Sequence, residues 1–484
     1  MPPPPASTTD PGSFRDPSGT VFFVNGEVFR GVSDETWETM KKLLSSGLLD
    51  ELMDAGMVVR TELVEDNSNL YRQLRSIQGG SPHFMKHEKV PFVSYPYEWS
   101  RRMIADAGLA QLSLQRKLIM KGFSLKDASI YNTQFIRGRP VFIDLPSIER
   151  PAKTGLWIAY GQFCRHFLFP LILAHHRSID LGGYYLSNLE GLNVDSVYKI
   201  LGGWRSARPS LFVDVFLQKH LQSYGQRHID STRRKIAAQG NDKPANADSS
   251  VQIINLDRLS RKVKRLRDKK DTTGHWVEYA ANNTYSDEAD TAKKQFIQRF
   301  AETRHPQRVL DLGCNTGTYS QIAEASGAFV VAADIDPECA DHLYDEVTRQ
   351  SLNILPICLD CANPSPGIGF MNRERASFLN RATFDAVFGL ALLHHLLITS
   401  RIPLPATRDF FASLTGRWLI LEFVGRKDSM FQHLLALRED IYGDITRENF
   451  EAVYSTQFTI IERQELPGSD RCLYLLEKNM DAQD

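Results

Sequence analysis

Short apolar runs alternate with amphipathic, helix-like stretches between residues 308 and 423. The first run, residues 308–312, leads into a glycine-rich turn and a helical stretch that Gly327 closes. Further apolar runs follow at residues 329–333, 354–358, 384–390 and 418–423. Buried strands that alternate with helices are typical of a parallel sheet covered on both faces. The pattern therefore predicts a doubly wound, Rossmann-like α/β domain over residues 273–480.

A different pattern covers the first half of the chain. Residues 99–120 carry apolar positions at the spacing of one helix face, and Gly122 ends the pattern. Two short extended runs, residues 134–136 and 140–143, flank a polar Arg-Gly-Arg turn and predict a hairpin. We expect an α+β domain over residues 21–230. The Pro-, Ser- and Thr-rich residues 1–20 are expected to be a disordered tail.

Residues 231–272 separate the two domains and are predicted to be a linker that contains a basic helix. An apolar stripe on this helix is formed by Leu256, Leu259, Val263 and Leu266, among many Lys and Arg residues. Charge runs are usually solvated faces, so we expect the stripe to dock on a neighbouring domain. Binding of nucleic acid through residues 258–270 is the alternative, and it predicts a steep dependence on salt. We do not expect a nucleic-acid partner.

The charge and hydropathy of the chain restrict its class. Its 484 residues have a formal net charge of -1, which excludes a chain-wide basic field for nucleic acid. The apolar run at residues 167–174 is interrupted by Pro170 and is too short for a membrane span. The Pro-rich start lacks the basic-then-apolar order of a signal peptide. We therefore expect a cytoplasmic protein with no membrane span.

The glycine turn after the first strand reads Asp311-Leu312-Gly313-Cys314-Asn315-Thr316-Gly317. Glycines there allow a ligand to approach the backbone closely. The next strand ends at Asp334, about 20 residues on, where an acidic side chain meets a ribose diol in such folds. Asp360 ends the third strand, and His394 and His395 follow the fourth. Since ligands bind at the carboxyl ends of parallel strands, these side chains predict one site.

Asp311 at the entrance of the turn distinguishes two ligands. It repels a dinucleotide pyrophosphate but suits a cationic ammonium or sulfonium, and the spacing is not G-x-G-x-x-G. The turn resembles the first motif of class I methyltransferases, which implies S-adenosyl-L-methionine as cofactor. By this resemblance Asp334 holds the ribose hydroxyls and Asp360 lies beside the adenine. The other implied cofactor residues are Asp311, Gly313, Cys314, Asn315, Gly317, Ile335, Leu390 and, as a cover segment, Trp276, Tyr279 and Tyr285.

Methyl transfer is an in-line displacement on a sulfonium, for which positioning can supply much of the rate. A hydroxyl or amine acceptor also loses a proton. His394 or His395 is the candidate base, although only one can face the pocket if their segment is regular. The alternative is that His394 packs against the cofactor and His395 caps the turn. The acceptor atom, O, N or C, stays open.

The first domain resembles protein and small-molecule kinases. Asp127 and Asn132 have the spacing of a kinase catalytic loop, and Asp144 follows the hairpin where a second metal ligand is expected. The resemblance implies that Asp127 is catalytic and that Asn132 and Asp144 bind Mg, with Mg-ATP as a second cofactor, if the site is active. Three features depart from the kinase pattern: Leu145-Pro146 after Asp144, Lys126 before Asp127, and an isolated Gly79-Gly80 in place of a Gly-rich loop.

Together the motifs resemble a sparsely characterised bacterial family of two-domain methyltransferases, some members of which are linked to nodulation. This resemblance implies transfer of a methyl group to a small-molecule, natural-product or glycan-precursor acceptor. One alternative is a bifunctional enzyme whose first domain is an active ATP-dependent kinase. Another is a non-catalytic scaffold that binds cofactor. The oligomeric state cannot be derived from these patterns.

Overall fold

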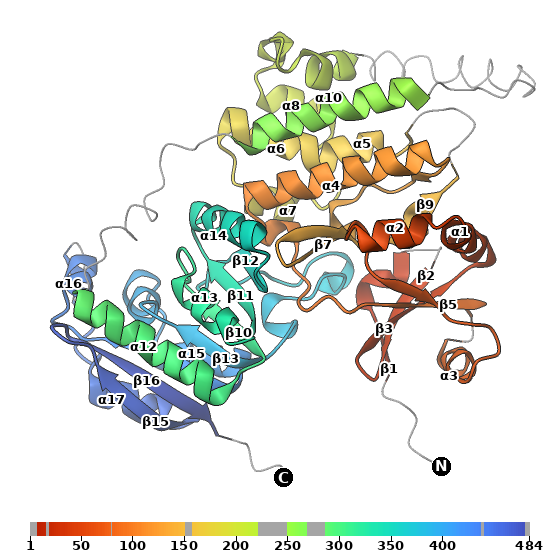
Figure 1. The fold of residues 1–484 in the computed structure, drawn as a ribbon. Helices are drawn as coiled ribbons and strands as arrows, with labels where there is room; N and C mark the ends of the chain where they lie inside the picture. Colours follow the sequence, from red (N-terminus) through yellow and green to blue (C-terminus); the bar gives the residue numbers. More distant parts are fainter. Residues whose placement is uncertain are drawn as a thin grey trace, which may run out of the picture.

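A computed structural model describes residues 7–15, 19–78, 80–150, 157–220, 249–268, 286–436 and 440–479 of the chain. Its N-terminal part combines a small antiparallel sheet with a layer of helices, and its C-terminal part is a larger sheet with helices on both faces (Figure 1). The two parts pack side by side. Helix α14 (Pro337–Gln350) and strand β12 (Ile354–Cys358) of the C-terminal part face α4 (Arg101–Met120), α7 (Leu181–Ser187) and β7 (Thr133–Ile136) of the N-terminal part.

The small sheet has the strand order β1-β2-β3-β5-β4, and all its neighbouring strands are antiparallel. The strands are β1 (Ser7–Thr9), β2 (Gly19–Val24), β3 (Glu27–Val32), β4 (Thr61–Leu63) and β5 (His83–His87). Phe22 of β2 and its register partner Phe29 of β3 are buried in one cluster with Phe84. Three helices accompany this sheet: α1 (Asp34–Ser45), α2 (Leu48–Asp54) and α3 (Asn69–Ile77).

The prediction of a disordered tail was wrong for residues 7–15. Ser7–Thr9 pairs with β2 as an edge strand, and a helical turn, η1 (Pro11–Arg15), follows. The backbone N–H of Asp10 donates to Val21 O at 2.9 Å, and that of Val21 donates to Ser13 Oγ at 2.7 Å. An open strand edge offers unpaired backbone groups, so a polar segment can be ordered without a core of its own.

The helical layer is built on α4 (Arg101–Met120), the helix predicted at residues 99–120. Ser100 caps it by accepting a hydrogen bond from the Met103 N–H at 3.5 Å. The predicted hairpin follows as β7 (Thr133–Ile136) and β8 (Arg139–Phe142). The remaining elements are η2 (Pro96–Glu98), β6 (Ser124–Leu125), η3 (Ile130–Asn132), η4 (Leu145–Ser147), β9 (Ile148–Glu149), α5 (Tyr160–Phe163), η5 (Cys164–Leu168), α6 (Phe169–Arg177), α7 (Leu181–Ser187), α8 (Val194–Ile200), η6 (Gly203–Ala207) and η7 (Phe212–Leu217).

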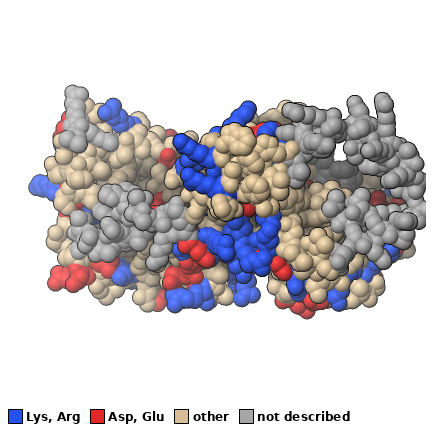
Figure 2. Space-filling view, turned by 90° about the horizontal axis from the view of Figure 1, so that it is seen from above, with Lys and Arg blue, Asp and Glu red and all other residues tan. Residues whose placement is uncertain are grey.

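The basic helix, α10 (Ser249–Arg267), docks its apolar stripe into the helical layer, against α4 and α6. Several of its cations form ion pairs with that layer, since Arg258 pairs with Asp214 and Arg267 with Asp106 at 2.7 Å. Basic side chains gather in the middle of the face seen from above, with acidic ones among them (Figure 2). The expectation that the stripe docks on a neighbouring domain is confirmed.

The C-terminal sheet has the order β12-β11-β10-β13-β14-β16-β15. The first five strands of this order are parallel, and β16 and β15 complete the sheet antiparallel. The strands are β10 (Arg308–Leu312), β11 (Phe329–Asp334), β12 (Ile354–Cys358), β13 (Phe384–Gly389), β14 (Thr415–Val424), β15 (Phe458–Glu465) and β16 (Arg471–Lys478). The helices and turns are α12 (Asp287–Arg304), α13 (Thr318–Ala325), α14 (Pro337–Gln350), η8 (Phe370–Asn372), η9 (Phe378–Asn380), η10 (His395–Thr399), α15 (Leu404–Leu414), α16 (Ser429–Leu435) and α17 (Arg447–Tyr454).

The predicted parallel strands are confirmed, and their order reverses beside β10. Chain order runs from β10 to β11 and β12 on one side, and then returns to β13 and β14 on the other. Such a switch point leaves a crevice at the carboxyl ends of the strands, where doubly wound sheets bind ligands. Among the described helices, none is both long and apolar enough to cross a membrane.

Candidate functional site

A cavity of about 640 Å³ opens at the carboxyl ends of β10, β11, β12 and β13. Its walls include the predicted residues Gly313, Cys314, Asn315, Asp334, Ile335, Asp360, Leu390, His394 and His395. The topology thus brings together predicted residues that lie up to 82 positions apart in the chain, from Gly313 to His395. A concave site of this size, with a few convergent polar groups, is the usual form of a small-molecule site.

The glycine turn supplies backbone groups to this cavity. Gly313 has φ of +72° and Asn315 of +49°, so the chain turns through the left-handed region twice within three residues. Gly317 has φ of +83°, and a Cβ there would lie 2.5 Å from the Leu343 side chain of α14. Gly317 does not line the cavity but lets α13 and α14 pack closely behind it.

Asp334 and Asp360, the carboxylates at the ends of β11 and β12, both line the cavity. Asp334 Oδ2 accepts from the Asn315 N–H at 2.7 Å, and Oδ1 accepts from the Asp336 N–H at 2.9 Å. Burial raises the pKa of Asp334, although these backbone donors oppose the shift. Each carboxylate oxygen has a second lone pair, so Asp334 is fixed in place and can still accept hydrogen bonds from a ligand.

Asp311 lies behind the cavity wall and does not line it, in contrast to the expectation. The side chain is on the same face of the sheet as Asp334, because Asp311 pairs with Ala332 in register. It is only 1% exposed, and Ser320 Oγ donates to it at 2.6 Å. Burial raises the pKa of Asp311 to about 6, although Ser320 and the Lys293 charge oppose the shift.

Replacing Asp311 by asparagine should therefore stabilise the protein in a pH-dependent way. Between about pH 4 and pH 6 the unfolded chain loses the Asp311 proton while the native state keeps it, so the wild type loses stability as pH rises. Each pKa unit corresponds to about 1.4 kcal/mol, so the variant should gain on the order of 2–3 kcal/mol at pH 7.5. Urea titrations at pH 7.5 and pH 4 measure this. An equal change at both pH values would contradict it.

His394 and His395 both reach the cavity, which a regular helix would not allow. They begin a wide turn, η10, and their ring centroids are 4.3 Å apart. His394 is 2% exposed, and neither ring nitrogen has a hydrogen-bond partner among the described residues. Burial, helped by His395 and Arg471, lowers the pKa of His394 well below its usual value. At neutral pH its imidazole is therefore uncharged and can accept a hydrogen bond.

A buried charge network beside His394 was not identified from the sequence. Glu422 on β14 accepts from Lys293 Nζ at 2.6 Å, from Arg471 Nη1 at 3.1 Å and from the Ala391 N–H at 3.1 Å. Asp428 forms a two-bond pair with Arg471, at 2.7 and 3.0 Å. Lys293 and Arg471 line the cavity, so the network shapes its wall. A lone carboxylate in the apolar strand at residues 418–423 is the signal that could have revealed it.

The residues present fit S-adenosylmethionine, the cofactor that the class I resemblance implies. Two carboxylates at neighbouring strand ends suit a ribose diol and a positively charged nucleoside. The glycine turn lets a ligand approach the backbone, and the unpartnered nitrogens of His394 leave polar groups for a second molecule. Trp276, Tyr279 and Tyr285, the expected cover segment, lie outside the described residues.

The three kinase-like residues gather in the N-terminal part. Asn132 Nδ2 donates to Asp144 Oδ2 at 3.4 Å, and the charge of Asp144 contributes to raising the pKa of Asp127, after the larger effect of burial. Asp144 is also paired with Arg30 of β3 and accepts from Ser147 Oγ. Both Asp144 oxygens are therefore already engaged, one of them by a cation.

Comparison with known proteins places the C-terminal part in a family. The sequence profile described as "Methyltransferase domain" matches residues 285–443. Nodulation protein NoeA of Rhizobium meliloti (strain 1021) is 33% identical over 470 residues, which cover 97% of this chain and 96% of that protein.

Solved structures of methyltransferases also match a part of this chain. N-methyltransferase NodS from Bradyrhizobium japonicum WM9, in complex with S-adenosyl-L-homocysteine, is 13% identical with a TM-score of 0.31, over 43% of this chain and all of that one. Magnesium protoporphyrin IX methyltransferase (ChlM) from Synechocystis PCC 6803, with bound S-adenosylmethionine, is 17% identical with a TM-score of 0.28, over 43% of this chain and 85% of that one.

Proposed function

Because this chain belongs to the family of nodulation protein NoeA and is an S-adenosylmethionine-dependent methyltransferase, we propose that it methylates a small-molecule, natural-product or glycan-precursor acceptor. The observation that carries this proposal is the cavity of about 640 Å³, which joins the glycine turn and two carboxylates to His394, whose ring nitrogens have no hydrogen-bond partner among the described residues. The name of the relative, a nodulation protein, supports an acceptor from saccharide or secondary metabolism.

We assign the cofactor to the wall that β10, β11 and β12 form. In this placement Asp334 accepts hydrogen bonds from the ribose hydroxyls, and Asp360 lies beside the adenine. Ile335 and Leu390 supply apolar contacts to the cofactor. Gly313, Cys314 and Asn315 carry the backbone that faces the methionine part. The bound cofactor supplies a methyl group on a positively charged sulfur, which a nucleophile can displace. Asp311 acts through Ser320, by holding the turn, and not by contact.

His394 is assigned to the acceptor. A neutral imidazole, 2% exposed and without a partner in the described part of the chain, can accept a hydrogen bond from an acceptor O–H or N–H. Its low pKa makes it a weak base, because a general base is most effective with a pKa near the working pH. We therefore propose that His394 orients the acceptor and excludes water, and that His395 assists it.

Transfer of labelled methyl groups tests this function. Wild-type protein, S-adenosylmethionine with a labelled methyl group and a cell extract should yield label in the small-molecule fraction. The product should be heavier than its precursor by one CH₂ group, and it should be missing from a deletion strain. Label found only in protein or nucleic acid would refute the proposed acceptor class. No transfer to any fraction would favour the non-catalytic scaffold.

ATP-dependent phosphoryl transfer by the N-terminal domain is a second candidate function. The gathering of Asp127, Asn132 and Asp144 favours it. The Arg30 pair opposes it, because a magnesium ion would have to displace or share Asp144 with a guanidinium. Thermal unfolding of the full chain with and without Mg-ATP tests whether the N-terminal domain has this function. A rise in the midpoint that needs both Mg and ATP supports a kinase, and no rise leaves the domain without this function.

A further inference from the structure

The contacts of the N-terminal domain with the C-terminal part include the two segments that leave the cofactor wall. One is α14, which begins three residues after Asp334. The other is the connection from β12 to β13, residues 359–383, which begins with cavity residues Leu359, Asp360 and Cys361. Side chains of the N-terminal domain contact both segments.

The β12–β13 connection is held by a buried ion pair. Arg381 donates two hydrogen bonds to Glu98, one of them at 2.8 Å, and a third to Val93 O at 2.8 Å. The side chains of Arg381 and Glu98 are 4% and 0% exposed. The Arg381 guanidinium also lies 4.9 Å from the ring centre of Phe92. A two-bond Arg–carboxylate pair fixes geometry as well as charge.

Two further contacts hold the same connection. The Ala376 N–H donates to Tyr95 Oη at 3.2 Å, and the Arg375 guanidinium lies 3.7 Å from the ring centre of Tyr131. Within the connection, the Phe378 N–H donates to Ser365 O at 2.9 Å, which ties the held part back toward Asp360. These contacts connect the domain interface to the segment that carries Asp360.

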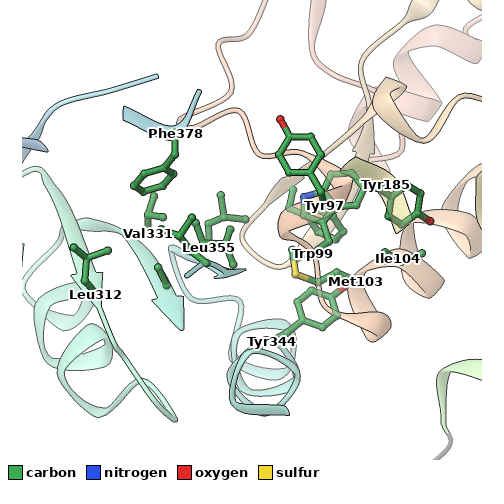
Figure 3. Close-up of a cluster of buried hydrophobic side chains, with 14 of the residues drawn as sticks. Tyr97, Trp99, Met103, Ile104, Tyr185, Leu312, Val331, Tyr344, Leu355 and Phe378 are labelled. Atoms are coloured by element: carbon green, nitrogen blue, oxygen red, sulfur yellow. The ribbon is translucent and has the colours of Figure 1, made fainter. Parts of the chain in front are cut away.

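The α14 side is held in a similar way. Asp341 on α14 accepts from the Arg102 N–H at 3.0 Å and so caps the first turn of α4 across the interface. Arg102 also forms an ion pair with Asp345. The rings of Phe135 and Tyr344 pack edge to face, with their centroids 5.8 Å apart. Figure 3 shows the apolar cluster between these contacts, where Tyr97, Trp99 and Met103 lie opposite Val331, Leu355 and Phe378.

We infer that the N-terminal domain is a clamp that positions the cofactor wall of the methyltransferase site, with Glu98, Arg381 and Tyr95 as positioning residues. None of the three lines the cavity, and they act through the connection that carries Asp360. The inference rests on the proposed placement of S-adenosylmethionine between Asp334 and Asp360. In this role the N-terminal domain supports methyl transfer by positioning the cofactor wall, and it need not catalyse a reaction itself.

Calorimetric titration of the full chain with S-adenosylmethionine tests the clamp. Glu98→Gln keeps the shape of the side chain but removes its charge, and should raise the Kd fivefold or more. Tyr95→Phe removes one hydrogen-bond acceptor and should raise it two- to fourfold. The matched control is Glu462→Gln, which breaks the exposed Arg299–Glu462 pair within the methyltransferase domain and should leave the Kd unchanged.

Hydrogen exchange separates positioning from a general loss of stability. In Glu98→Gln the amides of residues 361–381 should exchange faster, while those of β14 and β16 should not change. A Kd within twofold of wild type in folded Glu98→Gln overturns the inference. If that variant does not fold, Tyr95→Phe decides by the same two measurements. If Asp334→Ala also leaves the Kd unchanged, the proposed cofactor placement fails, whereas a failure of the interface variants alone refutes only the clamp.

Discussion

Replacing Glu422 by alanine is expected to lower the free energy of unfolding by about 3–5 kcal/mol, because a buried charge pair loses one partner. Glu422 is fully buried and accepts hydrogen bonds from Lys293, Arg471 and the Ala391 N–H. Asp428 still pairs with Arg471. The variant therefore removes the buried carboxylate that Lys293 and Arg471 share at the cavity wall.

A urea transition followed by far-UV circular dichroism measures this loss. Glu465→Ala is the matched control, since it removes a carboxylate from the exposed pair with Arg447 and should cost about 1 kcal/mol or less. Combining Glu422→Leu with Lys293→Met should recover part of the loss, because both charges leave together. If Glu422→Ala lowers the free energy of unfolding by less than about 1 kcal/mol, water or a movement of the side chains stabilises the two cations in place of Glu422. That result would contradict the prediction.

The parallel sheet could be predicted because its strands are buried on both faces. Residues such as Val309, Leu310, Val330 and Val331 are buried on opposite faces of their strands, so each strand appears in the sequence as a continuous apolar run. The carboxyl ends of parallel strands lie at one edge of the sheet. Asp334 and the two histidines could therefore be placed near one another from the sequence alone.

The partners of Glu422 in the buried network could not be predicted, because they are far apart in the chain. Lys293 and Arg471 lie on α12 and β16, 178 positions apart in the chain. Only the antiparallel pairing of β16 with β14 brings Arg471 beside Glu422. Neither the pairing nor the burial of two cations leaves a local pattern in the sequence, since Lys and Arg are mostly exposed residues.

Two features of the site have local causes that the sequence pattern does not show. Asp311 was expected in the cavity because it precedes the glycine turn. The strand continues through Asp311, however, and its carboxylate accepts a hydrogen bond from Ser320 Oγ behind the cavity wall. Only one of the two histidines was expected to face the pocket if their segment is regular, because helical spacing turns neighbouring residues apart by about 100°. The wide turn of η10 breaks that spacing, and wide turns of this kind are rare enough that sequence periodicity does not predict them.

Replacing Asp334 by alanine should weaken binding of S-adenosylmethionine on the order of 100-fold. Hydrogen bonds to a charged group are worth about 1.5–3 kcal/mol each, and 1.4 kcal/mol corresponds to a tenfold change in Kd. In the proposed placement Asp334 accepts two such bonds from the ribose hydroxyls, and it also holds the Asn315 and Asp336 backbone in place. Calorimetric titration of the full chain measures the change.

Asp336→Ala separates the ligand contact from the loss of a nearby carboxylate. Asp336 lies two residues further on, caps α14 by accepting from the Glu338 N–H at 2.8 Å, and does not line the cavity. Its removal should cost stability but change the Kd no more than a few fold, since only a screened charge is lost. If both variants weaken binding equally, the carboxylate acts through the field of the whole loop and not by contact with the ribose. The cofactor would then have to be placed elsewhere in the cavity.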